Sequence, residues 1–232
     1  MPRQQLCHDW GTSINGELAF LPGSSVVNFP AIGLTNASFS SKAALARTQL
    51  EQTPNAVYAV PLTAMRDYSD LAALPPATAT GIANMGLKTE TFGANAANLS
   101  TDDASMLGST TFQSRFLFTM PAEYDDGETV TVRLKSGMET TVADTSATVD
   151  VEAYLFDETG GLDGSPTDLC TTAAQSINSL TAATQNFTLT PTNLVSGSVL
   201  DIRLTATIDD SVTGTAVIGN IYSVAVLCDI RG

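Results

Sequence analysis

The feature that most constrains the fold is a series of short segments in which apolar and polar residues alternate. In residues 128–136 (ETVTVRLKS), Val130, Val132 and Leu134 alternate with threonines and an arginine. In residues 147–156 (ATVDVEAYLF), the same pattern directs Val149 and Val151 to one side and the acidic residues and Tyr154 to the other. A two-residue period is typical of a strand with one buried face. The pattern therefore predicts half-buried antiparallel strands.

Segments of this kind recur along the chain from residue 56 onward. The residues between them are rich in Gly, Asp, Ser and Pro, which favour turns. We therefore expect residues 58–232 to form an all-β domain, an antiparallel two-sheet sandwich of about eight strands that is jelly-roll-like. The strand segments are 56–68, 85–92, 111–120, 128–136, 147–156, 185–191, 198–208 and 221–230. The predicted core contains Val130, Val132, Leu134, Val149, Val151, Leu200, Ile202, Leu204, Val224 and Val226.

Residues 1–57 have a different character. They are apolar but interrupted by Pro22 and Pro30, and only the segment near 41–52 has a helical pattern, which Pro54 ends. Such a segment is too apolar for a solvated tail and too irregular for a separate domain. We expect an N-terminal arm with one short helix that buries its apolar side chains against a partner. The predicted partner-binding residues are Leu6, Trp10, Leu18, Phe20, Leu21, Val26, Val27, Phe29, Ile32 and Leu34.

Charge is distributed unevenly along the chain. The formal net charge is -14, and residues 1–58 contain three basic and three acidic residues, so residues 59–232 carry all of the excess. Binding to nucleic acid needs clustered Lys and Arg, which this acidic body lacks. No apolar run approaches the ~20 residues that span a bilayer, and the N-terminus lacks a secretory pattern. We expect neither nucleic acid nor membrane as a partner, and synthesis in the host cytoplasm.

The sequence Cys7-His8-Asp9-Trp10 holds the only histidine and the only tryptophan of the chain. Side chains of adjacent residues in an extended segment point to opposite sides, which suits a Cys-His dyad poorly. A zinc site would need ligands from distant segments, since no second histidine exists. We expect no enzymatic activity, no cofactor and no metal, and we interpret Trp10 as an aromatic anchor.

Three further features each have an ordinary structural explanation. Residues 157–168 contain four acidic side chains that could bind a hard cation, but without the spacing of a known calcium loop, so an ordinary hairpin loop is the alternative. Three cysteines at wide spacing indicate free thiols, with a disulfide between Cys170 and Cys228 as the alternative. Tyr124, just before a turn, indicates core packing or a corner hydrogen bond rather than a stacking platform for sugars.

Several strand and turn motifs resemble those of structural proteins of tailed bacteriophages, including cyanophages. They are P-x-E-Y-x-x-G-x-x-V-x-V-R from residue 121, S-G-x-x-L-D-I-R-L from residue 196 and the terminal C-D-I-R-G, and the resemblance covers residues 60–232. It implies a virion protein, a capsid decoration (cement) protein on the outer surface of the head. Such a protein would be a homotrimer that docks on the major capsid protein through its arm and bridges capsomers. The alternative is a tail or fibre adsorption module with a carbohydrate-binding jelly roll.

Overall fold

The chain divides into two units, Met1–Thr53 and Pro54–Gly232. The computed structural model describes residues 55–77, 84–89, 91, 93, 96–140, 145–156 and 167–231, and the backbone of two short strands near the N-terminus. These two strands, β1 (Ala19–Phe20) and β2 (Val27–Asn28), pair with each other in antiparallel orientation. The helix predicted near 41–52 lies outside the described residues.

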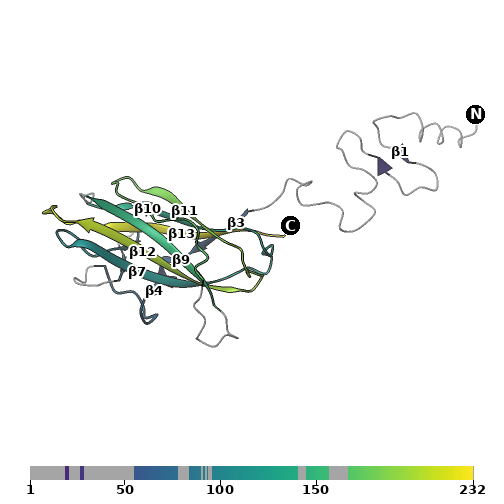
Figure 1. Ribbon diagram of the computed structural model, residues 1–232, viewed down its shortest axis with the longest axis horizontal. Coiled ribbons are helices and arrows are strands. Elements are labelled where there is room, and N and C mark those ends of the chain that lie inside the picture. Colours follow the sequence, from purple (N-terminus) through teal and green to yellow (C-terminus); the bar gives the residue numbers. More distant parts are fainter. Residues whose placement is uncertain are drawn as a thin grey trace, which may run out of the picture. The chain divides into compact units, whose positions relative to one another are not determined.

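The second unit is a sandwich of two antiparallel sheets (Figure 1). The five-stranded sheet has the order β10-β9-β12-β7-β4, and the six-stranded sheet has the order β11-β8-β13-β6-β5, with β3 also paired to β13. The five-stranded sheet contains β4 (Arg66–Asp67), β7 (Gly108–Thr119), β9 (Ser146–Phe156), β10 (Gln175–Ser176) and β12 (Val199–Asp210). The six-stranded sheet contains β3 (Asn55–Val60), β5 (Gly86–Lys88), β6 (Asn98–Ser100), β8 (Val130–Met138), β11 (Ala183–Leu189) and β13 (Gly219–Asp229).

The long strands alternate between the two sheets along the chain. β7, β9 and β12 belong to the five-stranded sheet, and β8, β11 and β13 belong to the six-stranded sheet. This alternation confirms the predicted all-β, jelly-roll-like sandwich. The only helical element among the described residues is a single 3-10 turn, Leu62–Ala64. No helix of the described residues is long and apolar enough to cross a membrane.

The core lies between the sheets and contains the predicted residues. All ten predicted core side chains are at most 2% exposed. Phe112, Phe116 and Phe187 fill the space between them and are also buried. The alternation of β12 is complete, because every second residue from Leu200 to Asp210 is buried. Two-residue periodicity was therefore a sound guide to which side chains face inward.

Two short strands of the second unit were not predicted. β6 is buried at all three positions and therefore shows no alternation, and β10 is a polar pair of residues. Conversely, the segment 85–92 forms only the three residues of β5. There the chain passes very close to a neighbouring segment, since a Cβ atom added to Gly86 would lie 2.5 Å from the Cα atom of Ala77. Glycine is needed at this close approach.

Residues of two of the resemblance motifs contact each other. Arg231, in the terminal motif, donates a backbone hydrogen bond to the carbonyl oxygen of Glu123 at 2.6 Å. Its guanidinium also binds Asp126, with Nη2 2.6 Å from Oδ2, and Asp125, with Nε 3.3 Å from Oδ1. These motif residues therefore fasten the last strand to the β7–β8 connection, which is a structural role.

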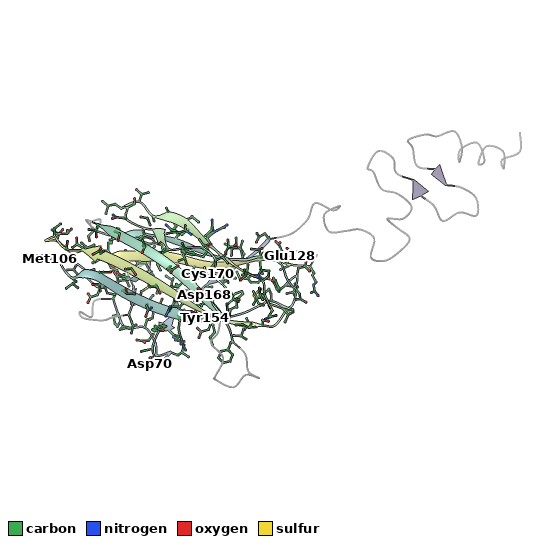
Figure 2. All side chains as sticks on the ribbon, viewed as in Figure 1. Asp70, Met106, Glu128, Tyr154, Asp168 and Cys170 are labelled. Carbon is green, nitrogen blue, oxygen red and sulfur yellow. The ribbon has the colours of Figure 1, made fainter. Side chains whose placement is uncertain are left out.

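Tyr124 forms the predicted corner hydrogen bond. Its ring is fully buried, and its hydroxyl donates to the backbone oxygen of Glu128. Burial raises the pKa of Tyr124 to about 12. This corner lies toward the end of the sandwich opposite Met106 (Figure 2).

The alternative of a disulfide between Cys170 and Cys228 is wrong, because both thiols are free. Cys228 points into the core from β13 and is 1% exposed, whereas Cys170 is half-buried beyond β9. Burial raises the pKa of each thiol to about 11. A protonated thiol is a poor nucleophile, so Cys228 acts as a small apolar core group, and Cys170 packs against the edge of the core.

Candidate functional site

Charged side chains gather on the outer face of the five-stranded sheet. The register places Arg203 of β12 between Glu152 of β9 and Arg115 of β7. One step along the same strands, Asp201 lies between Tyr154 and Leu117. Because alternate residues of a strand point to the same face, these two rows lie next to each other on the solvent side of the sheet. β9, β12 and β7 run side by side in Figure 1.

The side chain of Arg203 is fixed by contacts with two neighbouring side chains, Tyr68 and Glu152. Its Nη1 donates a hydrogen bond of 2.9 Å to the hydroxyl oxygen of Tyr68, and its guanidinium carbon lies 5.0 Å from the centre of the Tyr68 ring. Its Nη2 forms an ion pair with Glu152. The hydroxyl of Tyr154 donates to the other oxygen of Glu152 at 3.4 Å. One arginine therefore connects two tyrosines, directly and through a carboxylate.

Tyr68 reaches this cluster from a turn that follows β4. β4 pairs with β7, which brings the turn to the edge of the sheet. Asp67 shapes the turn, because its Oδ1 accepts hydrogen bonds from the backbone amide and the hydroxyl of Ser69, at 2.8 and 2.6 Å. These bonds lower the pKa of Asp67 and keep it ionised. The position of Tyr68 is therefore defined by the turn as well as by Arg203.

Arg115 and Asp201 form a looser pair. Arg115 Nη1 lies 3.8 Å from Asp201 Oδ2, and the two side chains are about one-quarter exposed, at 25% and 26%. Burial raises the pKa of Asp201, and the nearby Arg115 opposes that rise. The Nε atom of Arg115 is buried and has no hydrogen-bond partner among the described residues. Because their 3.8 Å contact is too long for a hydrogen bond and both side chains are partly exposed, Arg115 Nη1 and the Asp201 carboxylate keep capacity for a further polar partner.

Five of these residues line a shallow hollow of about 200 Å3: Tyr68, Arg115, Tyr154, Asp201 and Arg203. With Glu152 beside them, two arginines face two carboxylates, so the cluster has no net formal charge. Tyrosine rings offer apolar faces, and the charged groups offer fixed donors and acceptors. Such a surface suits a ligand that has both CH faces and hydroxyl groups.

The predicted partner-binding side chains, from Leu6 to Leu34, all lie outside the described residues. So do residues 157–166, which hold three of the four acidic side chains of the proposed cation loop. The fourth, Asp168, accepts backbone hydrogen bonds from Ala153 and Cys170, both at 2.9 Å, through one oxygen. Within the described part of the chain, no group of three or more His, Cys, Asp or Glu residues could hold a metal ion.

Sequence reasoning missed the hollow on the sheet. It directed Glu152 and Tyr154 to the outer face correctly, but it did not bring them together with Tyr68, Arg115 and Arg203. The signal was present in the outward positions of three strands, Tyr154 in β9, Asp201 and Arg203 in β12, and Arg115 in β7. Combining these positions requires the strand register.

Several of the solved structures similar to this chain are carbohydrate-binding modules, and all of these share low identity with it. A structure described as the xylan-binding module CBM15 is 14% identical, with 77% of this chain and 99% of that chain covered and a TM-score of 0.43. The CBM22-1 xylan-binding domain from Paenibacillus barcinonensis Xyn10C is 11% identical, with 64% and 83% covered and a TM-score of 0.37. A CBM61 module in complex with beta-1,4-galactotriose is 12% identical, with 76% and 90% covered and a TM-score of 0.32. No family model and no curated protein matches the sequence.

Proposed function

We propose that the second unit is a glycan-binding module whose site is the outer face of the five-stranded sheet. The observation that carries the proposal is the hollow in which two tyrosines surround a loose Arg115–Asp201 pair, 3.8 Å apart. An ion pair of that length is too long for a hydrogen bond, so a sugar hydroxyl beside the pair can hydrogen-bond to both partners. A hydroxyl both donates and accepts hydrogen bonds, so neighbouring hydroxyls of one ring can satisfy Asp201 and Arg115 together.

The division of roles within the site follows from the contacts. Arg203 and Glu152 hold the tyrosines in place, whereas Arg115 and Asp201 are free to exchange their mutual contact for contacts with a ligand. Hydrogen bonds to charged groups contribute about 1.5–3 kcal/mol each, more than those between neutral groups. Each hydrogen bond that a sugar hydroxyl makes to Arg115 or Asp201 can therefore contribute substantially to the affinity.

The charge of the site and of the unit around it indicates that the ligand is a neutral glycan. The cluster has no net formal charge, and the body around it carries the whole -14 of the chain. A sulfated or uronate-rich polymer would be repelled by that field, most strongly at low salt. The outer face also continues beyond the hollow, with Leu117 and Phe156 each 52% exposed toward one end and Thr205 beside Gln113 toward the other. A strip of this kind fits a chain of several sugar units.

This function corresponds to the adsorption alternative of the sequence analysis. The capsid-decoration hypothesis stays a prediction, since it depends on arm side chains outside the described residues. Co-sedimentation of the protein with tail-free phage heads tests it directly, with major capsid protein as the expected partner. The predicted location on the outer surface of the capsid has the same test.

The decisive experiment for the glycan site is a glycan array probed with the labelled full-length chain, followed by titration of the best ligand. We expect selective retention of neutral oligosaccharides and at least tenfold weaker binding by the Arg115→Ala variant. Arg133→Ala is the matched control, because Arg133 lies on the outer face of the other sheet, where its Nε donates to Asn186 at 2.9 Å. Equal loss in both variants, or no glycan retained, would refute the proposal.

The same samples test for turnover. Glu152 and Asp201 are two carboxylates on one face, which is also the minimum set for glycoside hydrolysis. We propose binding without hydrolysis, since Glu152 is committed to Arg203 and Tyr154. Release of reducing ends from the bound oligosaccharide over a day, abolished by Asp201→Asn, would show that the protein is a hydrolase instead.

A further inference from the structure

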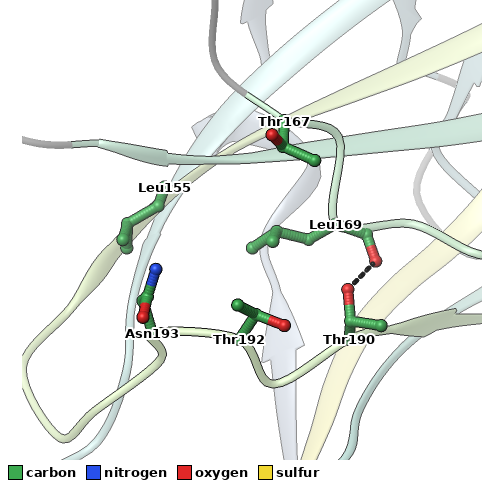
Figure 3. Close-up of a pocket in the computed structure, with 6 residues that line it drawn as sticks. All are labelled: Leu155, Thr167, Leu169, Thr190, Thr192 and Asn193. Atoms are coloured by element: carbon green, nitrogen blue, oxygen red, sulfur yellow. Dashed lines mark hydrogen bonds between the residues drawn. The ribbon is translucent and has the colours of Figure 1, made fainter. Parts of the chain in front are cut away.

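A second hollow, of about 250 Å3, lies at one end of the sandwich (Figure 3). It is formed where β9 ends, between the segment 167–170 and the turn 190–193 that follows β11. Its lining residues are Leu155, Thr167, Leu169, Thr190, Thr192 and Asn193. Tyr154 and Leu155 are neighbours in β9 and point to opposite faces of the sheet. The two hollows therefore lie on opposite sides of this strand.

Hydrogen bonds that involve the backbone hold the walls of this hollow, which we call the end hollow. The Leu169 amide donates to Ala153 at 2.8 Å, and the Leu169 oxygen accepts from the amide and the hydroxyl of Thr190, at 2.7 and 3.0 Å. The turn is closed by a bond of 3.0 Å from the Leu194 amide to the Pro191 oxygen. Leu169 is 6% exposed and forms the floor. These contacts fix the walls before any ligand arrives.

Asn193 adopts a backbone conformation that is unusual for a residue other than glycine. Its φ is +62°, in the left-handed region, which costs roughly 1 kcal/mol for a residue with a side chain. Asparagine tolerates this region better than most residues, but glycine would fit it without the penalty. Figure 3 shows the Asn193 amide directed into the hollow, toward Leu155. Local strain at a residue that lines a cavity is a frequent mark of a functional site.

Three polar side chains of the lining have unused hydrogen-bonding capacity. Thr167, Thr192 and Asn193 make no side-chain hydrogen bond to other described residues, whereas Thr190 is bound to Leu169. In Figure 3 the Thr192 side chain faces the space below Leu169. None of the six lining side chains carries a charge. The nearest acidic neighbour in the sequence, Asp168, accepts two backbone hydrogen bonds.

We propose that this end hollow is a separate binding site for a single neutral sugar ring. Its volume of about 250 Å3 can hold one six-membered ring. The apolar face of the ring would pack on Leu155 and Leu169, and its hydroxyls would bind Asn193, Thr192 and Thr167. The site differs from the sheet face, where charged groups provide the polar contacts. The two proposals are independent, since no side chain lines both hollows.

The test is a set of titrations of the full-length chain with glucose, galactose, mannose and xylose, followed by amide chemical shifts. We expect saturable binding of at least one sugar in the millimolar range, with shifts at residues 167–170 and 190–194. The Asn193→Gly variant removes the amide but keeps the backbone conformation, so its Tm should not fall below that of the wild type. Its affinity should fall at least fivefold. Thr192→Val, which keeps the shape of the side chain, should also weaken binding.

The sheet-face variant Arg115→Ala separates this proposal from the glycan-binding proposal. It should leave monosaccharide binding at the end hollow unchanged, whereas Asn193→Gly should leave oligosaccharide binding at the sheet face unchanged. The end-hollow proposal is overturned if none of the four sugars saturates, or if Asn193→Gly binds as tightly as the wild type. It is also overturned if Arg115→Ala abolishes the monosaccharide shifts.

Discussion

The corner residue Tyr124 gives the sharpest stability prediction. Replacing Tyr124 by phenylalanine keeps the buried ring but removes the hydroxyl that donates to the Glu128 backbone oxygen. Loss of one such bond costs about 1 kcal/mol. At pH 7 to 9 we therefore expect the Tyr124→Phe variant to be less stable than the wild type by about that amount.

The same residue makes stability depend on alkaline pH. The pKa of Tyr124 is raised from 10.0 to about 12 by burial, so the folded protein holds this proton more tightly than the unfolded chain. The resulting contribution is complete below pH 10 and is lost as the pH rises toward 12. Linkage gives a loss of about 1.3 kcal/mol between pH 9 and pH 11 for a shift of this size. The Tyr124→Phe variant has no ionisable group at this position, so its stability does not fall with pH for this reason.

The two effects combine into one measurement. Urea unfolding at pH 9, 10 and 11 should show the stability difference between wild type and Tyr124→Phe shrinking until the two proteins are about equally stable at pH 11. The other tyrosines whose pKa is raised by burial, Tyr58 and Tyr154, are present in both proteins and cancel in the difference. A difference that stays constant from pH 9 to pH 11 would refute the argument.

Further predictions concern the core, the thiols, the C-terminus and the oligomeric state. Leu204→Ala, at a site with 0% exposure, should lower the free energy of unfolding by about 3 kcal/mol, whereas Thr205→Ala on the outer face should change it by less than about 0.5 kcal/mol, as measured by urea titration. Cys228, with a pKa raised by burial to about 11, should react with a thiol reagent at pH 8 only after unfolding. Arg231→Ala should lower stability by only about 0.5 kcal/mol, since its ion pairs are partly exposed, and a larger loss would mean that the corner depends on it. Light scattering should give three times the chain mass of 24.2 kDa if the predicted homotrimer forms without capsids.

The core was predictable from sequence because burial and alternation are local properties. In β12 the inward residues Leu200, Ile202 and Leu204 can be assigned without knowing which strands lie beside them. The strand β6 was missed because it has only three residues, and two of its buried side chains, Asn98 and Ser100, are polar. Its assignment needs the fold around it.

The sheet-face site was not predictable because its residues meet only through non-local pairing. Arg115, Glu152 and Arg203 lie on three strands that are far apart in sequence, and a shift of one residue in any register would move its side chain to the other face. Tyr68 comes from a turn after a two-residue strand, a context that has no periodic signal. The LDIRL motif did contain Asp201 and Arg203, but the motif alone does not show which of its residues share a face.

The arrangement around Arg203 leads to a last prediction about how the sheet face works. Arg203 uses separate nitrogen atoms for Tyr68 and Glu152, a geometry that the single ammonium group of lysine cannot reproduce. Arg203→Lys should therefore keep the charge and most of the stability but release Tyr68 and weaken oligosaccharide binding.

If Arg203 acts by positioning Tyr68, then Tyr68→Ala should also weaken binding, and the double variant should bind no more weakly than the worse single variant, because the second change removes an effect already lost. Titration of the four proteins with one oligosaccharide measures this coupling. The unfolding free energy of each variant is the control. Additive losses in binding free energy would show instead that Arg203 and Tyr68 contact the ligand independently, and that the site is a set of separate contacts rather than a preorganised unit.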